Sequence, residues 1–171
     1  MDEKILEVQD LNVFLNTRDG RLHVVRDVSF DLYRGEILGI TGALGCGATE
    51  LALSLFGFQP AKSGTIEISG GTVRVNSVRD AMRLGIAYVP EDRLSEGLLL
   101  PVSIARNMAL SVIDRLSCGG FLRMHRVRES ARSWLEKLRI AAPSVDIPVR
   151  NLSGGNQQRV LLARWLATEP R

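Results

Sequence analysis

The stretch Glu36-Ile37-Leu38-Gly39-Ile40-Thr41 runs directly into a glycine-rich loop, Gly42-Ala43-Leu44-Gly45-Cys46-Gly47-Ala48-Thr49. The apolar run is typical of a buried strand, and Leu51, Ala52 and Leu55 then recur at helical spacing. A glycine loop between a strand and a helix can turn several backbone N–H groups toward a phosphate. These residues therefore predict an α/β fold built around a phosphate-binding loop.

The loop follows the pattern G-x-x-x-x-G-K-[ST] except at one position, because Ala48 stands where lysine is expected. In that pattern the lysine reaches the β- and γ-phosphates and the hydroxyl, here that of Thr49, holds Mg²⁺. The glycine spacing with a following Ser or Thr arises by chance in about one chain in ten of this length. A tight turn without a ligand is the alternative. The candidate phosphate-binding residues are Gly42, Ala43, Leu44, Gly45, Cys46, Gly47, Ala48, Thr49 and Glu50.

Composition narrows the class of protein. With 171 residues and 45% hydrophobic residues, the chain is long enough for one globular domain. Its net charge of +3 is too small to indicate nucleic-acid binding without a local patch. Cys46 and Cys118 lack C-x-x-C spacing, which favours a reducing cytoplasm over a zinc site or a disulfide framework. The least polar window, 37–58, contains five glycines and several polar residues, so a membrane span is not expected.

The chain divides by pattern into three parts. Alternating segments at 5–11 and 28–33, joined through a loop at 16–20, predict strands, and 65–69 with 72–75 predict a short hairpin. A second buried strand is expected at 86–89, and Ser77 with Asp80 predicts a helix start. Helical periodicity dominates from about residue 103, with one helix expected at 104–116. We expect a β-rich core with the glycine loop at 1–93, a helical subdomain at 94–146, and a last motif with its helix at 147–171.

That last motif is the most specific signal in the sequence. It reads Asn151-Leu152-Ser153-Gly154-Gly155-Asn156-Gln157-Gln158-Arg159 and leads into a helical pattern. A serine hydroxyl, the N–H groups of two glycines and the positive end of a helix dipole form an anion-binding arrangement. The alternative is an N-cap serine after a glycine turn. The candidate ligand residues are Ser153, Gly154, Gly155, Asn156 and Gln157.

This motif resembles the signature of the ATP-binding cassette (ABC) transporter ATPases, and its extended form resembles cassettes that power importers of ribose, galactose and xylose. The resemblance covers essentially the whole chain. It implies a P-loop NTPase-like ABC cassette core with an antiparallel β subdomain and an α-helical subdomain. It also implies ATP and Mg²⁺ as ligands, a head-to-tail partner cassette whose ATP the signature contacts, and a membrane permease subunit. The expected location is cytoplasmic and peripheral, on the inner face of the cell membrane, with no nucleic-acid partner.

Departures from the family pattern indicate which cassette this is. Besides Ala48, Glu91 occupies the position where the family usually has the Q-loop glutamine. The segment Pro90-Glu91-Asp92-Arg93 is similar to that of the second of two cassettes fused in sugar-importer ATPases, where the loop lysine is commonly replaced. Phe14, or Leu15 in a shifted frame, is the candidate for the aromatic residue that the family places on adenine.

The family continues past a Leu-Ala-Thr-Glu-Pro-Arg segment like residues 166–171 into a Walker B strand with a catalytic glutamate. We therefore expect a C-terminally incomplete cassette of reduced stability that hydrolyses no ATP alone, with a degenerate site that binds nucleotide weakly. Two alternatives stay open: a non-transport ABC ATPase acting on nucleic acid or ribosomes, and a non-hydrolysing pseudo-cassette. The basic residues of 123–132 are interspersed with Glu129, which is typical of a solvated helix face.

Overall fold

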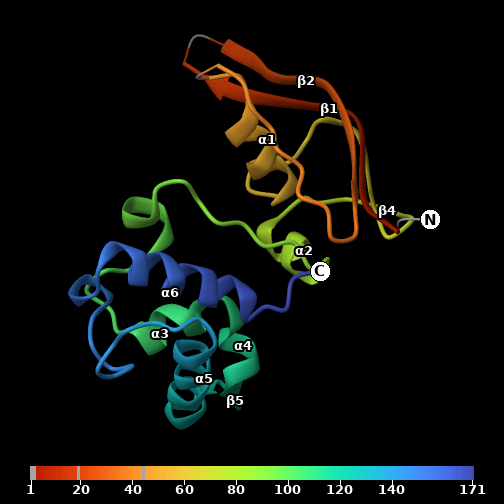
Figure 1. The fold of residues 1–171 in the computed structure, drawn as a ribbon. Coiled ribbons are helices and arrows are strands. Elements are labelled where there is room, and N and C mark those ends of the chain that lie inside the picture. The colour runs from red at the N-terminus through yellow and green to blue at the C-terminus, as the bar shows by residue number, and fades with distance from the viewer. Residues whose placement is uncertain (1–2, 19, 44) are drawn as a thin grey trace. The chain divides into compact units, whose positions relative to one another are not determined.

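A computed structural model describes residues 3–18, 20–43 and 45–171 of the chain (Figure 1). It contains two compact units, Met1–Ile86 and Ala87–Arg171, which are described here one at a time. No helix within the described residues is long and apolar enough to cross a membrane.

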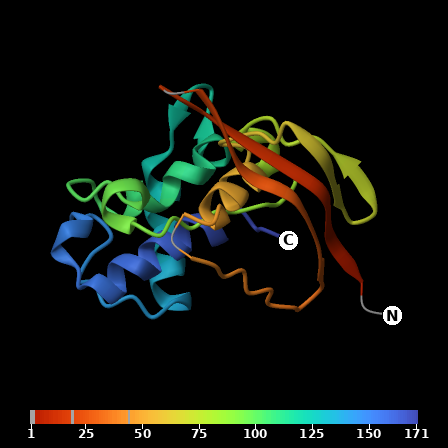
Figure 2. The ribbon, with the colours of Figure 1, turned by 90° about the horizontal axis from the view of Figure 1, so that it is seen from above.

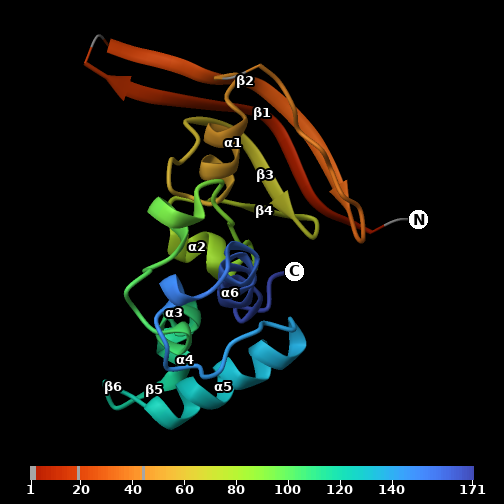
Figure 3. The ribbon, with the colours of Figure 1, turned by 60° about the vertical axis from the view of Figure 1, so that its left-hand side comes forward.

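The first unit is built on a four-stranded antiparallel sheet in the order β2-β1-β3-β4 (Figure 3). The long strands β1 (Lys4–Thr17) and β2 (Gly20–Tyr33) pair from end to end, and β3 (Ser63–Ile68) with β4 (Gly71–Val73) forms a short hairpin. The predicted strands in these regions are confirmed. The loop predicted at 16–20 overlaps both strands, because β1 continues to Thr17 and β2 begins at Gly20. Asp19 lies outside the described residues.

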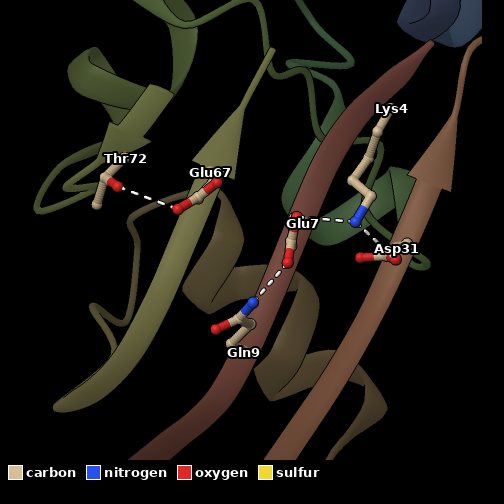
Figure 4. A network of polar contacts seen from close by, with 6 residues as sticks. All are labelled: Lys4, Glu7, Gln9, Asp31, Glu67 and Thr72. Carbon is tan, nitrogen blue, oxygen red and sulfur yellow. Dashed lines mark hydrogen bonds and ion pairs between the residues drawn. The ribbon is translucent and has the colours of Figure 1, made fainter. Parts of the chain in front are cut away.

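The sheet has an apolar and a polar face. Val8, Leu11 and Val13 of β1 are each no more than 1% exposed. Figure 4 shows polar contacts that connect the strands, in which the Lys4 ammonium lies 2.8 Å from Glu7 and 2.9 Å from Asp31. The hydrogen bonds to these carboxylates raise the pKa of Lys4. Val8 and Leu11 are three residues apart, and both are buried because the register of β1 against β2 shifts between them.

Two helices complete the first unit, and both agree with the sequence patterns. α1 (Ala48–Leu55) begins within the glycine loop and buries Leu51. α2 (Val78–Arg83) begins after Ser77, whose hydroxyl oxygen accepts from the Asp80 N–H at 3.2 Å and whose O–H donates to the Asp80 carboxylate at 2.8 Å. This is the partial capping box that the sequence predicts.

The predicted buried strands at 36–41 and 86–89 are wrong, because both segments lack regular secondary structure. Figure 2 shows the chain between β2 and α1 as a long loop. Ile37 is 95% exposed and Ile40 is 51% exposed. An apolar run forms a strand only where a neighbouring strand completes its hydrogen bonds. Within the described residues no strand pairs with either segment, so strand propensity alone does not order them.

The second unit is mainly helical, and α3 (Ile104–Ala109) lies between α5 (Met124–Lys137) and α6 (Gly154–Leu166) (Figure 1). Its core includes Ile104, Val127 and Leu161, each no more than 1% exposed. Smaller elements are the helical turn η1 (Arg93–Gly97), the 3₁₀ turns η2 (Leu110–Val112) and η3 (Val149–Asn151), the helix α4 (Ile113–Leu116), and the strands β5 (Ser117–Cys118) and β6 (Phe121–Leu122).

The helix predicted at 104–116 is interrupted. The backbone at Val112 leaves the helical region (φ −129°, ψ 21°), while its side chain is only 8% exposed. The break keeps Val112 in the core, at the cost of helix continuity. Burial of one side chain therefore outweighs local helix propensity here.

Candidate functional site

The glycine loop ahead of α1 has a backbone that requires glycine at two described positions. Gly47 has φ of +93°, and a Cβ there would lie 2.4 Å from the Val24 carbonyl oxygen of β2. A Cβ on Gly42 would lie 2.5 Å from the Cys46 sulfur. At Gly47 the loop is therefore pressed against β2 with no room for a side chain, whereas at Gly42 a side chain would meet that of Cys46.

The start of α1 has the features of a phosphate-binding terminus. Gly47 is its N-cap and provides no side-chain hydrogen bond, so the first-turn N–H groups are not capped by a side chain. The Thr49 side chain is exposed in this turn, whereas Ala48 supplies no charge. Glu50 lies in the same turn. These residues fit nucleotide phosphates through backbone N–H groups and could offer Mg²⁺ the Thr49 hydroxyl. No cluster of three or more His, Cys, Asp or Glu residues capable of holding a metal is found in the described part of the chain.

A cavity of about 430 Å³ lies beside this loop. Val24 and Val28 of β2 line one side, and Cys46 to Ala48 line another. Phe14, the candidate adenine contact, is not among the lining residues. Its ring stacks on His23 at a centroid distance of 4.1 Å, and the Arg21 guanidinium lies 4.3 Å from it. The ring that could hold a base is therefore engaged with side chains of β2.

The second motif forms the N-terminus of α6. Ser153 is the N-cap residue, with extended backbone and no side-chain cap hydrogen bond. Ser153, Gly154 and Gly155 are all exposed. A helix of 13 residues that begins with uncapped, exposed N–H groups presents the positive end of its dipole to solvent. The arrangement can bind an anion.

Asn156 and Gln157 of the same motif face the protein. The Gln157 amide is 8% exposed and donates to the Leu152 carbonyl at 3.1 Å and to the Val149 carbonyl at 3.4 Å. The Asn156 amide donates to the Ser153 hydroxyl at 3.1 Å, and its oxygen accepts from the Ala141 N–H at 3.2 Å. Both side chains hold the turn that precedes α6.

The segment from Glu91 to Gly97 also lies in the second unit. Glu91 is exposed. The Asp92 carboxylate accepts from the Leu94 N–H at 2.9 Å and from the Ser95 hydroxyl at 2.8 Å. The hydrogen bond from the Ser95 hydroxyl, together with those from the backbone, lowers the pKa of Asp92. Asp92 therefore caps η1 in its charged form.

A buried cation near this segment was not apparent from the sequence. Arg164 of α6 is 8% exposed and donates to the Asn107 carbonyl at 2.8 Å, to the Asn107 side-chain oxygen at 2.7 Å, and to the Gly97 carbonyl at 2.5 Å. Burial lowers its pKa. Its position one turn after Leu161 on the apolar face of α6 is the only signal that could have identified it.

Comparison with known proteins defines the class. A family profile described as ABC transporter matches residues 25–171, and the chain belongs to this family. Its fold is that of ABC cassettes. The structure of cbiO1 from Clostridium perfringens, part of the ABC transporter complex cbiONQ, matches 99% of this chain and 63% of its own length, with a TM-score of 0.72 and 26% identity. A dimeric bacterial ABC transporter cassette matches 97% of this chain and 71% of its own length, with a TM-score of 0.75 and 19% identity.

The curated relatives are sugar-import proteins by name. A ribose import ATP-binding protein of Rhizobium etli is 47% identical over 85% of this chain and 29% of its own length. A putative ribose/galactose/methyl galactoside import ATP-binding protein of Burkholderia cenocepacia is 45% identical over 96% of this chain and 31% of its own length. The chain thus spans about a third of the length of these relatives.

Proposed function

We propose that this chain is part of an ATP-binding subunit that energises a sugar importer, acting peripherally on the cytoplasmic face of a membrane. The names of the relatives at 45–47% identity support the sugar class. Its partners in this proposal are a second cassette, arranged head to tail, and a membrane permease. The cassette dimer among the structural neighbours supports the pairing.

The observation that carries the proposal is the exposed, uncapped N-terminus of α6. Ser153, Gly154 and Gly155 offer one hydroxyl and successive N–H groups to an anion. In the proposed complex the anion is the γ-phosphate of ATP held by the partner cassette. Asn156 and Gln157 keep the turn in shape. This chain then completes an active site that belongs mainly to its partner.

The chain's own glycine loop has a lesser part in the proposal. Backbone N–H groups from Gly42 to Glu50 hold nucleotide phosphates, and the Thr49 hydroxyl holds Mg²⁺. The missing lysine removes charge-assisted bonds of roughly 1.5–3 kcal/mol, or about ten- to a hundredfold in affinity. With Glu91 at the Q-loop position, this site binds nucleotide weakly and hydrolyses it slowly or not at all. We expect no ATP turnover by the purified 171-residue chain alone.

The test compares two variants in the assembled transporter. Ser153→Arg places a long side chain in the anion position and is expected to abolish transport-coupled ATP hydrolysis, whereas Ala48→Ser is expected to leave it nearly unchanged. Ser133→Arg, the same change at an exposed position of α5, is the matched control. Equal losses from Ser153→Arg and Ala48→Ser would refute the unequal roles of the two motifs.

A further inference from the structure

Arg93 reaches the N-terminus of α6. Its Nη2 atom lies 3.0 Å from the point where a Cβ on Gly154 would stand. Any side chain at position 154 would therefore displace this guanidinium. The contact joins the Pro90-Glu91-Asp92-Arg93 segment to the signature motif, which is 60 residues further along the chain. Neither sequence pattern alone indicates that the two meet.

The turn that carries Arg93 is fixed against α6 at several points. The Asp92 carboxylate caps the start of η1. At the other end, a Cβ on Gly97 would lie 2.8 Å from a Leu161 methyl carbon, so glycine permits the close approach of η1 to α6. The Gly97 carbonyl also accepts from Arg164 at 2.5 Å. The backbone on both sides of Arg93 is thus anchored, at Asp92 and at Gly97.

Arg93 stands in a mixed electrostatic setting, because the Asp92 carboxylate attracts its charge while the start of α6 opposes it. A guanidinium stands at the positive end of a helix dipole, where cations are disfavoured. Its Nε atom is buried and has no hydrogen-bond partner among the described residues. The neighbouring Asp92 carboxylate is engaged with Leu94 and Ser95. A partly buried guanidinium with its Nη2 beside uncapped helix N–H groups is a combination that a bound phosphate would satisfy.

We propose that Arg93 is a phosphate-binding residue of the signature motif. Its guanidinium and the N–H groups of Gly154 and Gly155 form one cradle for the terminal phosphate of a nucleotide. The inference rests on the proposed function, in which the signature receives the partner's ATP. It adds a cation, Arg93, to the signature site. The chain's glycine loop lacks the corresponding cation, because Ala48 replaces its lysine.

The experiment uses the ¹⁵N-labelled chain and inorganic phosphate as the probe. Phosphate is expected to shift the amide resonances of Gly154 and Gly155 and the Nε–H resonance of Arg93. Arg93→Met should weaken phosphate binding about tenfold, as expected for loss of a charge-assisted hydrogen bond. Arg93→Lys should retain an intermediate affinity. Arg126→Met, at an exposed position of α5 with no hydrogen bond or ion pair among the described residues, is the matched control and should bind like the unchanged chain.

A stability measurement separates this role from a structural one. If Arg93 only supported the fold, Arg93→Met would lower the urea midpoint in the absence of phosphate. We expect instead an unchanged midpoint, because removing a cation from a positive helix end offsets the loss of its attraction to Asp92. Phosphate shifts that are equal in Arg93→Met and the unchanged chain, or absent from both, would overturn the inference. The transporter assay with Ser153→Arg decides the proposed function separately.

Discussion

The buried cation Arg164 allows the sharpest prediction about stability. Replacing it with methionine keeps the volume and the apolar stem but removes all three hydrogen bonds to Asn107 and Gly97. The acceptors at Asn107 retain other donors, since its carbonyl also accepts from the Leu110 N–H and its side-chain oxygen from the Leu99 N–H at 2.9 Å. The Gly97 carbonyl has no other hydrogen bond among the described contacts of the chain. One buried acceptor is therefore left without a partner.

The magnitude follows from these contacts. Three hydrogen bonds to a charged donor contribute about 1.5–3 kcal/mol each, and the gain is reduced by several kcal/mol for taking the guanidinium out of water. Methionine recovers that desolvation cost but leaves the Gly97 carbonyl unpaired, which costs about 1–3 kcal/mol. We expect a net loss of about 2–4 kcal/mol in the free energy of unfolding of the second unit.

Tryptophan fluorescence measures this unit selectively, because the only two tryptophans, Trp134 and Trp165, both belong to it. With a urea dependence of about 1–2 kcal/mol per molar, the Arg164→Met midpoint should fall by about 2 M. Arg132→Met, an exposed substitution of the same type on α5, should change it little. Equal midpoints for the two variants would refute the view that Arg164 anchors Gly97 and α3.

Three further outcomes are expected. Gly47→Ala should destabilise the first unit by about 1–3 kcal/mol more than Gly45→Ala, because both positions have positive φ but only at Gly47 would a Cβ meet a backbone atom within 4 Å; equal urea midpoints would contradict this. Ser54→Ala should raise stability by about 1 kcal/mol, since this fully buried hydroxyl has no partner among the described residues; slower hydrogen exchange in α1 would show it. The pKa of Asp92 is lower in the folded chain than its ordinary value of 3.8, so its carboxylate stabilises η1 at any pH above 3.8. This stabilisation is lost as the pH falls through the lower pKa of the folded chain. NMR of the Asp92 carboxyl group should show its titration below pH 3.8. If the Leu94 and Ser95 amide resonances moved to unbonded positions already above pH 3.8, the prediction would be wrong.

The sequence predicted those elements whose cause is local. The Ser77–Asp80 capping pair, the hairpin before it and the helix after the glycine loop all formed where the patterns placed them. Each depends on turn chemistry or periodicity within a few residues. The predicted strand at 36–41 failed because a central strand depends on neighbours far away in the sequence.

The sequence by itself indicated the family and both candidate anion-binding motifs, because the glycines of 42–47 and the Ser153-Gly154-Gly155 motif encode their backbone conformations locally. Tertiary structure alone decided which side chain from elsewhere in the chain lies beside the signature motif. Arg93 comes to lie over Gly154 because Gly97 can approach Leu161 and because Arg164 holds the Gly97 carbonyl. These contacts join residues about 60 positions apart, where no local pattern acts, so only close packing could bring them together.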